Sequence, residues 1–369
     1  MMTTLARLDM RAGRALLSSL LCVFAFAGAR ADIPPPSASP KVWSYLNQLA
    51  PDARIAVMKK EAAREGALTI YGALGIDRAK ILIQSFSERY PSIKVDFVRL
   101  REAELVERVN TEARANQVHG DLAISNVAWL DLLKGSLGHY RPTSWSDYKK
   151  DFVFGSDAEG WTAVAYEVLP STIAWRTDRV SQSQAPRTLQ EIVDPKWKGR
   201  TGTTSHLETL MAGLIDVMGE KKAMPLIDKL AALDNRLYPS IASLSDALSQ
   251  GEIDVAWNMG AHRPVKLKDQ GAPVDYVMQD PLLGQGITVS VINGAKNSYA
   301  AALFMEYLTR AETLEAIDKA EGGRVFGNTK GKYRIDLATL PSLTLFKAIP
   351  PQRFDKLSQL SESKFLRRR

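Results

Sequence analysis

The sequence of 369 residues contains a single cysteine, Cys22, and only four histidines. One cysteine cannot form an intramolecular disulfide, so a disulfide-stapled scaffold is excluded, as are metal sites built from several cysteines. Hydrophobic residues make up 45% of the chain and charged residues 24%, which is the composition of a globular protein. A disordered chain and a multi-span membrane protein are therefore excluded as well.

The chain has little excess charge of either sign, because 48 Lys and Arg stand against 41 Asp and Glu, giving a net charge of +7. We find no basic stripe interleaved with aromatic residues, so we expect no nucleic acid partner. The length suits about two domains at ~100–200 residues each.

The N-terminus has the pattern of a secretory signal peptide. Three arginines precede an uncharged, apolar run over residues 15–29, and small residues follow at Ala29-Arg30-Ala31. The run is too short for a permanent membrane span, and the alternative is a buried N-terminal helix. We expect cleavage after Ala31 and a soluble protein in the periplasm of a Gram-negative-like cell.

Strands alternate with helices along most of the chain. Helical spacing covers residues 42–65, and short β-prone runs then appear at 68–71, 93–98 and 121–124, with helical patterns between them. The alternation restarts after about Trp175. Such a pattern is typical of βαβ units, so we predict two α/β units with mainly parallel sheets.

Four short segments resemble a known family. They begin at Glu65-Gly66, Gly120-Asp121-Leu122, Asp194-Pro195-Lys196-Trp197-Lys198-Gly199 and Gly294-Ala295-x-Asn297. In their order and spacing the chain resembles bacterial extracellular solute-binding proteins of the type 2 periplasmic-binding fold. The similarity is to the branch that includes binders of ferric ion, thiamine and phosphonate or phosphorylated compounds. The Asp194–Gly199 segment favours a structural role, with Asp194-Pro195 as a turn and Trp197 as an apolar anchor.

The resemblance implies two α/β lobes, each a mainly parallel sheet flanked by helices, with a ligand cleft between them. The boundaries we expect are a signal peptide at 1–31, a proline-rich lead with an N-terminal helix at 32–60, lobe 1 at 61–165 plus 284–345, lobe 2 at 166–283 and a C-terminal tail at 346–369.

Polar side chains and glycines at the predicted strand ends and helix starts are the candidate binding residues. In an open α/β sheet, ligands bind at the carboxyl ends of the strands, near helix N-termini that attract anions. The same residue types are favoured as helix N-caps, so both interpretations stay open for any one of them. The candidates are Tyr71, Gly72, Ser125, Asn126, Thr203, Thr204, Ser205, His206, Ser240, Asn258 and Arg263.

We expect no metal and no cofactor. Ferric-binding members of the family carry adjacent tyrosines at the place where this sequence has Asn258-Met259-Gly260. Phenolate oxygens suit Fe³⁺, whereas methionine is a soft ligand and glycine has no side chain. The four histidines show no spacing of metal ligands.

The resemblance implies a non-enzymatic, substrate-binding component of an ABC transporter that closes on its solute by a hinge and delivers it to a membrane permease. Hydroxyls and amides at helix starts favour a small anionic organic solute, a carboxylate, phosphonate or phosphorylated compound. We expect a monomer. The alternatives are a ferric-ion or iron-chelate binder of the same family, an exported α/β hydrolase or transferase, and the effector domain of a regulator. The sequence has no G-x-S-x-G, H-E-x-x-H or P-loop motif.

Overall fold

The computed structural model describes residues 33–366, so the predicted signal peptide and its cleavage site lie outside the described part of the chain. Two helices, α1 (Ser39–Gln48) and α2 (Pro51–Glu65), precede the first strand. The single helical pattern expected over residues 42–65 is thus divided, because Pro51 disfavours helical geometry in the residue before it and is well suited to start a new helix. Gly66, with φ of 68°, ends α2.

The first sheet contains parallel strands at one edge. Strand β1 (Ala67–Gly72) lies between β2 (Lys94–Arg99) and β3 (Leu122–Asn126) and is parallel to both. Strand β10 (Leu283–Val291) follows β3 in antiparallel orientation and pairs in turn with β5 (Trp161–Arg176).

Helices and short strands complete this sheet. The helices are α3 (Ile76–Arg89), α4 (Glu102–Arg114), α5 (Leu130–Leu133), α11 (Ser298–Leu308) and α12 (Ala311–Ala320). The short strands are β4 (Val153–Ser156) and β11 (Val325–Phe326), which pair with β5, and β12 (Thr344–Leu345), which pairs with β10.

The second sheet is formed on the C-terminal part of β5. There β5 pairs in antiparallel orientation with β8 (Val255–Gly260) and β9 (Val274–Met278), while β6 (Thr201–Thr204) is parallel to β8 and β7 (Arg236–Tyr238). The helices of this part are α6 (Leu189–Ile192), α7 (Glu208–Met218), α8 (Glu220–Ala231), α9 (Ile241–Gln250) and α10 (His262–Asp269).

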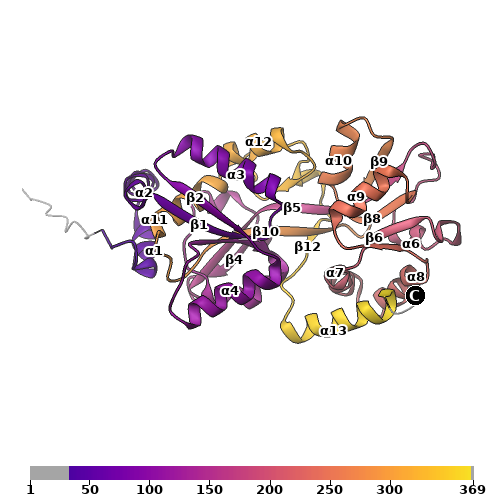
Figure 1. Ribbon diagram of the computed structural model, residues 1–369, viewed down its shortest axis with the longest axis horizontal. Helices are drawn as coiled ribbons and strands as arrows, with labels where there is room; N and C mark the ends of the chain where they lie inside the picture. The colour runs from indigo at the N-terminus through magenta and orange to yellow at the C-terminus, as the bar shows by residue number, and fades with distance from the viewer. Residues whose placement is uncertain (1–32, 367–369) are drawn as a thin grey trace, which may run out of the picture. The chain divides into compact units, whose positions relative to one another are not determined.

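Strand β5 therefore belongs to both sheets, and in Figure 1 it leads from β1 and β10 toward β6 and β8. All of its 16 residues are buried except Leu169. Both sheets are mixed, with parallel pairs at the edges and antiparallel pairs around β5. The contacts do not test the lobe boundaries expected from the sequence, which stay a prediction.

The C-terminal segment is ordered and crosses from the first sheet to the second. After β12, the Ile349 N–H donates to the Ala128 carbonyl oxygen at 3.0 Å, and helix α13 (Pro351–Ser361) then packs against α7 (Figure 1). Arg353 pairs with Asp216 of α7 at 2.7 Å.

Short turns link these elements. The 3₁₀ turns are Val127–Trp129, Lys134–Ser136, Trp145–Asp147, Lys150–Phe152, Pro195–Trp197 and Leu337–Thr339, and a π-helical turn covers Glu362–Leu366. The Asp194–Gly199 segment has the structural role that its sequence favoured. The Asp194 side chain accepts the Lys196 N–H, and Trp197 is buried in the core of the second sheet.

Buried carboxylates hold α11 in place. Asp121 accepts the N–H groups of Thr69, Lys296 and Asn297 and the side-chain amide of Asn297. Through these contacts it joins β1 and the start of β3 to the beginning of α11. Glu65, at the end of α2, accepts two further N–H groups, those of Tyr299 and Ala300. Burial raises the pKa of Glu65 to about 7.

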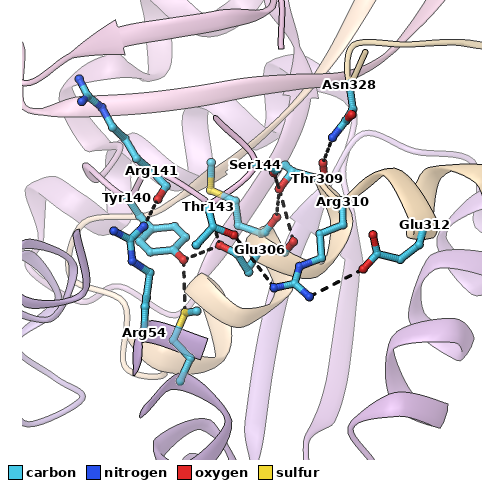
Figure 2. A network of polar contacts seen from close by, with 12 residues as sticks. Arg54, Tyr140, Arg141, Thr143, Ser144, Glu306, Thr309, Arg310, Glu312 and Asn328 are labelled. Atoms are coloured by element: carbon cyan, nitrogen blue, oxygen red, sulfur yellow. Dashed lines mark hydrogen bonds and ion pairs between the residues drawn. The ribbon is translucent and has the colours of Figure 1, made fainter. Parts of the chain in front are cut away.

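A third carboxylate, Glu306 of α11, holds the segment over residues 140–144 (Figure 2). The Tyr140 hydroxyl donates to it at 2.9 Å, the Thr143 N–H donates at 2.8 Å, and the Thr143 hydroxyl donates as well. Burial and the negative charge of Glu306 raise the pKa of Tyr140 well above its usual value. Arg310, two residues beyond the end of α11, pairs with Glu306 at 3.3 Å.

We expect Asp121→Ala to lower the free energy of unfolding by about 3 kcal/mol or more, because it leaves several donors without their acceptor in a mostly buried position. Urea unfolding at neutral pH measures this loss. Asp131→Ala, at a partly exposed residue of α5, is the control and should change the free energy of unfolding by less than about 0.5 kcal/mol. Equal losses in the two variants would contradict the role given to Asp121.

Candidate functional site

A cavity of about 530 Å³ lies where residues of both sheets meet. From the first sheet it is lined by the start of α4 and the end of β3, and from the second by the ends of β6 and β8 and the starts of α7 and α9. Leu169, the one residue of β5 that is not buried, also lines it. The partial exposure of Leu169 thus marks the place where the continuous strand passes the cavity.

Three helices of the described part of the chain begin at this cavity, and the N-cap residues of α4 and α7 make no side-chain capping hydrogen bond. At α9, the Ser240 hydroxyl accepts the Ser243 N–H at 3.1 Å, and at α4 the Glu104 carboxylate accepts the Arg101 N–H at 2.9 Å. The residue before α7 is Leu207, and no side chain caps the first turn. The first N–H groups of α7, together with the positive end of its dipole, form an anion-binding feature at the cavity wall.

Hydroxyl and amide groups lie beside the start of α7. Thr204 ends β6, and its hydroxyl donates a long hydrogen bond of 3.4 Å to the His206 carbonyl oxygen, which an oxyanion could replace as the acceptor. Thr209 is in the first turn of α7 and also lines the cavity. These groups can donate hydrogen bonds to an oxyanion bound at the helix N-terminus.

Asn258 reaches the cavity through a β-bulge. The register of β5 and β8 shifts between Thr172 and Ile173, which pair with Met259 and Trp257 and leave Asn258 as the extra residue. Its φ of 55° is left-handed, a conformation that asparagine tolerates better than most residues. The Ser171 hydroxyl donates to its side-chain oxygen at 3.2 Å, so bulge and hydrogen bond together position this side chain.

Glu102, at the start of α4, places a carboxylate in the cavity wall. Its Oε1 accepts the Asn126 N–H at 2.9 Å, whereas its Oε2 is buried and has no hydrogen-bond partner among the described residues. Burial raises the pKa of Glu102 to about 8, although the hydrogen bond from Asn126 acts in the opposite direction.

The aromatic part of the lining comes from two distant segments. Trp129 follows β3, while Phe346 and Phe354 belong to the C-terminal segment. The ring centroids of Trp129 and Phe354 are 4.9 Å apart. The C-terminal segment is therefore part of the cavity wall as well as a connection between the two sheets.

The structure brings together some of the residues predicted as binding residues. Those that line the cavity are Asn126, Thr204, His206, Ser240 and Asn258. Of these, Ser240 also serves as the N-cap of α9, the alternative that the sequence left open. Contact of these residues with a ligand stays a prediction.

Strand alternation separates other predicted residues from the cavity. Ser125 is buried beside β10, where its carbonyl oxygen accepts the Thr288 hydroxyl at 2.9 Å. Thr203 is fully buried one residue before Thr204. Neighbouring residues of a strand point to opposite faces, so only one of each adjacent pair reaches the cavity. Ser205 and Arg263 are not among the lining residues either.

Tyr71 and Gly72, at the end of β1, are likewise not part of the lining. The Tyr71 hydroxyl donates to Glu112 at 2.8 Å, and burial together with this carboxylate raises the pKa of Tyr71. A Cβ atom at Gly72 would lie 2.5 Å from the ring of Phe97, so close packing of β1 against β2 explains the glycine.

The sequence reasoning missed Glu102, Ser171 and the three aromatic residues. Glu102 could have been found, because it starts a helix directly after a strand, the same signal that selected Asn126. Phe346 and Phe354 carry no such signal, since they lie in a segment interpreted as a tail.

The lining contains no tyrosine among the described residues. Within residues 33–366, no group of three His, Cys, Asp or Glu side chains has the arrangement of a metal site. No helix in this part of the chain combines the length and apolar character needed to cross a membrane.

A family profile described as bacterial extracellular solute-binding protein matches residues 82–326. Among curated protein sequences, none matches this chain significantly.

Solved structures with the same fold are numerous. Iron-bound HitA from Pseudomonas aeruginosa aligns with a TM-score of 0.67 at 16% identity, over 81% of this chain and 99% of that one. The periplasmic binding protein AfuA from Actinobacillus pleuropneumoniae, with fructose-6-phosphate bound, gives 0.64 at 19% identity, over 81% and 98%. A substrate binding protein of an ABC transporter from Agrobacterium tumefaciens gives 0.69 at 16% identity, over 81% and 94%. These likenesses confirm the predicted α/β class and the type 2 periplasmic-binding fold.

We expect Glu102 to make the ligand-free protein less stable as the pH rises. Its pKa of about 8 in the folded state exceeds the ordinary 4.5, so between these values the folded state holds more protons than the unfolded state. The free energy of unfolding therefore falls as pH rises from 5 to 8. In Glu102→Gln this decline should be shallower, with a residual slope from Glu65, whose pKa is raised in the same direction.

Urea unfolding at pH 5, 6, 7 and 8 measures the two profiles. Glu107→Gln is the matched control, because it removes the same charge from an exposed position of the same helix and should keep the wild-type slope. Identical slopes in wild type and Glu102→Gln would show that Glu102 is not held protonated.

Proposed function

The chain belongs to the bacterial extracellular solute-binding proteins, and from this premise we propose that it captures a small anionic organic solute and delivers it to the permease of an ABC importer. Members of this family bind solutes rather than transform them, which confirms the expectation of a binding protein rather than an enzyme. The family name also fits the expected place of action outside the cytoplasm. The signal peptide, the periplasmic compartment and the monomeric state remain predictions.

The observation that carries the proposed solute class is the uncapped start of α7 in the wall of a cavity of suitable size. About 530 Å³ is within the range of ~300–1,000 Å³ that is usual for small-molecule sites. The first N–H groups of α7 and the hydroxyls of Thr204 and Thr209 can surround one oxyanion. AfuA, which has the same fold, is described with a phosphorylated sugar bound, which is a solute of this class.

Closure by a hinge is consistent with the way the cavity is built. Its lining comes from elements of both sheets, which share β5, so a change of angle between the sheets would open or close the cavity. A solute that contacts both sides would favour the closed arrangement.

The ferric-ion alternative has less support. HitA, of the same fold, is described as iron-bound, but no tyrosine is found among the described lining residues that could supply a phenolate. An iron chelate of an organic acid carries carboxylate groups and could use the same anion-binding feature, so iron must be part of the test.

The test is thermal unfolding of the ligand-free protein with phosphorylated and carboxylated compounds, with ferric citrate and with Fe³⁺ alone. A compound that binds the folded state raises the midpoint of unfolding, and the shift grows with the logarithm of its concentration relative to its dissociation constant. We expect stabilisation by iron-free phosphorylated or carboxylated organic anions. Stabilisation by Fe³⁺ or ferric citrate only would contradict the proposed solute class.

We expect Thr204→Ala combined with Thr209→Ala to weaken binding of the stabilising compound by about a hundredfold or more, because each of the two lost hydrogen bonds to a charged group is worth about 1.5–3 kcal/mol. Isothermal titration calorimetry measures the dissociation constants. Ser205→Ala is the control, since this neighbouring hydroxyl is outside the lining and its loss should leave the affinity unchanged. Equal affinity in the double variant and the wild type would remove both threonines from the site.

A further inference from the structure

We propose that the solute carries, besides its anionic group, a hydrogen-bond donor, an ammonium or hydroxyl group, that binds Oε2 of Glu102. This inference rests on the proposed function and narrows it to zwitterionic or hydroxylated anions. It assigns to Glu102 a role in solute selection.

The carboxylate of Glu102 is held in a fixed orientation with one oxygen left over. Its Oε1 is engaged by the Asn126 N–H at 2.9 Å, so the group cannot turn without losing this hydrogen bond. Its Oε2 is buried and accepts no hydrogen bond from any described residue. Buried polar atoms of folded proteins nearly always have a partner, and for an unpaired atom in a cavity wall a bound molecule can supply it.

Among the described residues, no basic side chain pairs with this oxygen. Arg101, the residue before Glu102, is directed to another carboxylate: its Nε donates to Glu104 at 2.9 Å, and its side chain is 83% exposed. The other carboxylate of the lining, Glu208, lies 3.8 Å from His206. Glu102 thus differs from Glu208 in having no basic side chain beside it, and the donor has to come from the solute.

The start of α7 and the carboxyl group of Glu102 together define a class of solute. The start of α7 attracts negative charge. Burial keeps Glu102 protonated at neutral pH in the ligand-free protein, with the proton on Oε2 because Oε1 accepts the Asn126 N–H. An ammonium group displaces this proton and pairs with the carboxylate, and a hydroxyl group exchanges hydrogen bonds with Oε2. The aromatic side chains of Trp129 and Phe354 supply apolar contact in the same cavity. Amino phosphates, amino acids and polyol phosphates combine the two required groups in one small molecule, and simple alkyl phosphates do not.

The experiment compares pairs of compounds that share an anionic group and differ in the donor. The pairs are O-phosphoethanolamine with ethyl phosphate, γ-aminobutyrate with butyrate, and fructose 6-phosphate with hexyl phosphate. Their dissociation constants are measured by titration calorimetry with the full mature chain, using wild type, Glu102→Gln and Glu107→Gln. Glutamine keeps an oxygen for the Asn126 N–H but places a donating amide where Oε2 lies.

We expect the donor-bearing member of at least one pair to bind wild type at least tenfold more tightly than its partner. Glu102→Gln should lose this preference, and Glu107→Gln, on an exposed position of the same helix, should keep it. Equal affinity of both members for wild type would overturn the inference but leave the proposed function standing. A preference retained in Glu102→Gln would equally overturn the role of Oε2. Failure of every compound to bind would refute both the inference and the proposed solute class.

Discussion

The continuity of β5 is the constraint on which the other features depend. Its N-terminal part pairs with β10 and its C-terminal part with β8 and β9, so one strand fixes the register of both sheets. Almost every residue of the strand is buried, because helices or other strands cover it along most of its length. The cavity lies beside the one exception, Leu169, whose side chain is partly exposed although its backbone pairs with Gln285 of β10. A cavity at this place is lined by strand ends from both sheets and by the first residues of helices that belong to them.

The polar groups of the cavity differ in how completely the protein satisfies them. Ser240 and Asn258 are engaged in a helix cap and a bulge, whereas the first turn of α7 and Oε2 of Glu102 have no partner among the described residues. Unsatisfied polar groups cost stability in the ligand-free protein. Unpaired polar groups in a cavity are typical of groups that form their hydrogen bonds with a ligand. Because binding removes the cost of leaving them unpaired, that free energy contributes to the affinity for the ligand.

Much of the fold could be predicted, because alternating helical and strand patterns and the spacing of four segments are properties of the chain itself. The site was predicted only in part. The rule that strand ends carry binding residues selected Asn126 and Thr204, which line the cavity, and also their neighbours Ser125 and Thr203, which do not. Packing against other strands determines which side chains of a strand face the cavity, and a single sequence does not reveal this packing.

The position of Asn258 shows a second reason why the site could be predicted less completely than the fold. Its exposure to the cavity depends on a bulge opposite β5, a pairing between segments far apart in the sequence. The aromatic residues of the C-terminal segment were missed for a similar reason, because nothing in their local pattern indicates that they pack beside Trp129.

The C-terminal segment has a consequence for biogenesis. A chain exported through the expected signal peptide leaves the membrane N-terminus first, so both sheets can form before Phe346 and Phe354 have emerged. Until then the cavity lacks one wall, and Trp129 lacks its aromatic neighbour. Competence to hold a solute is therefore the last property that the emerging polypeptide acquires, and a chain that ends before Phe346 lacks this wall.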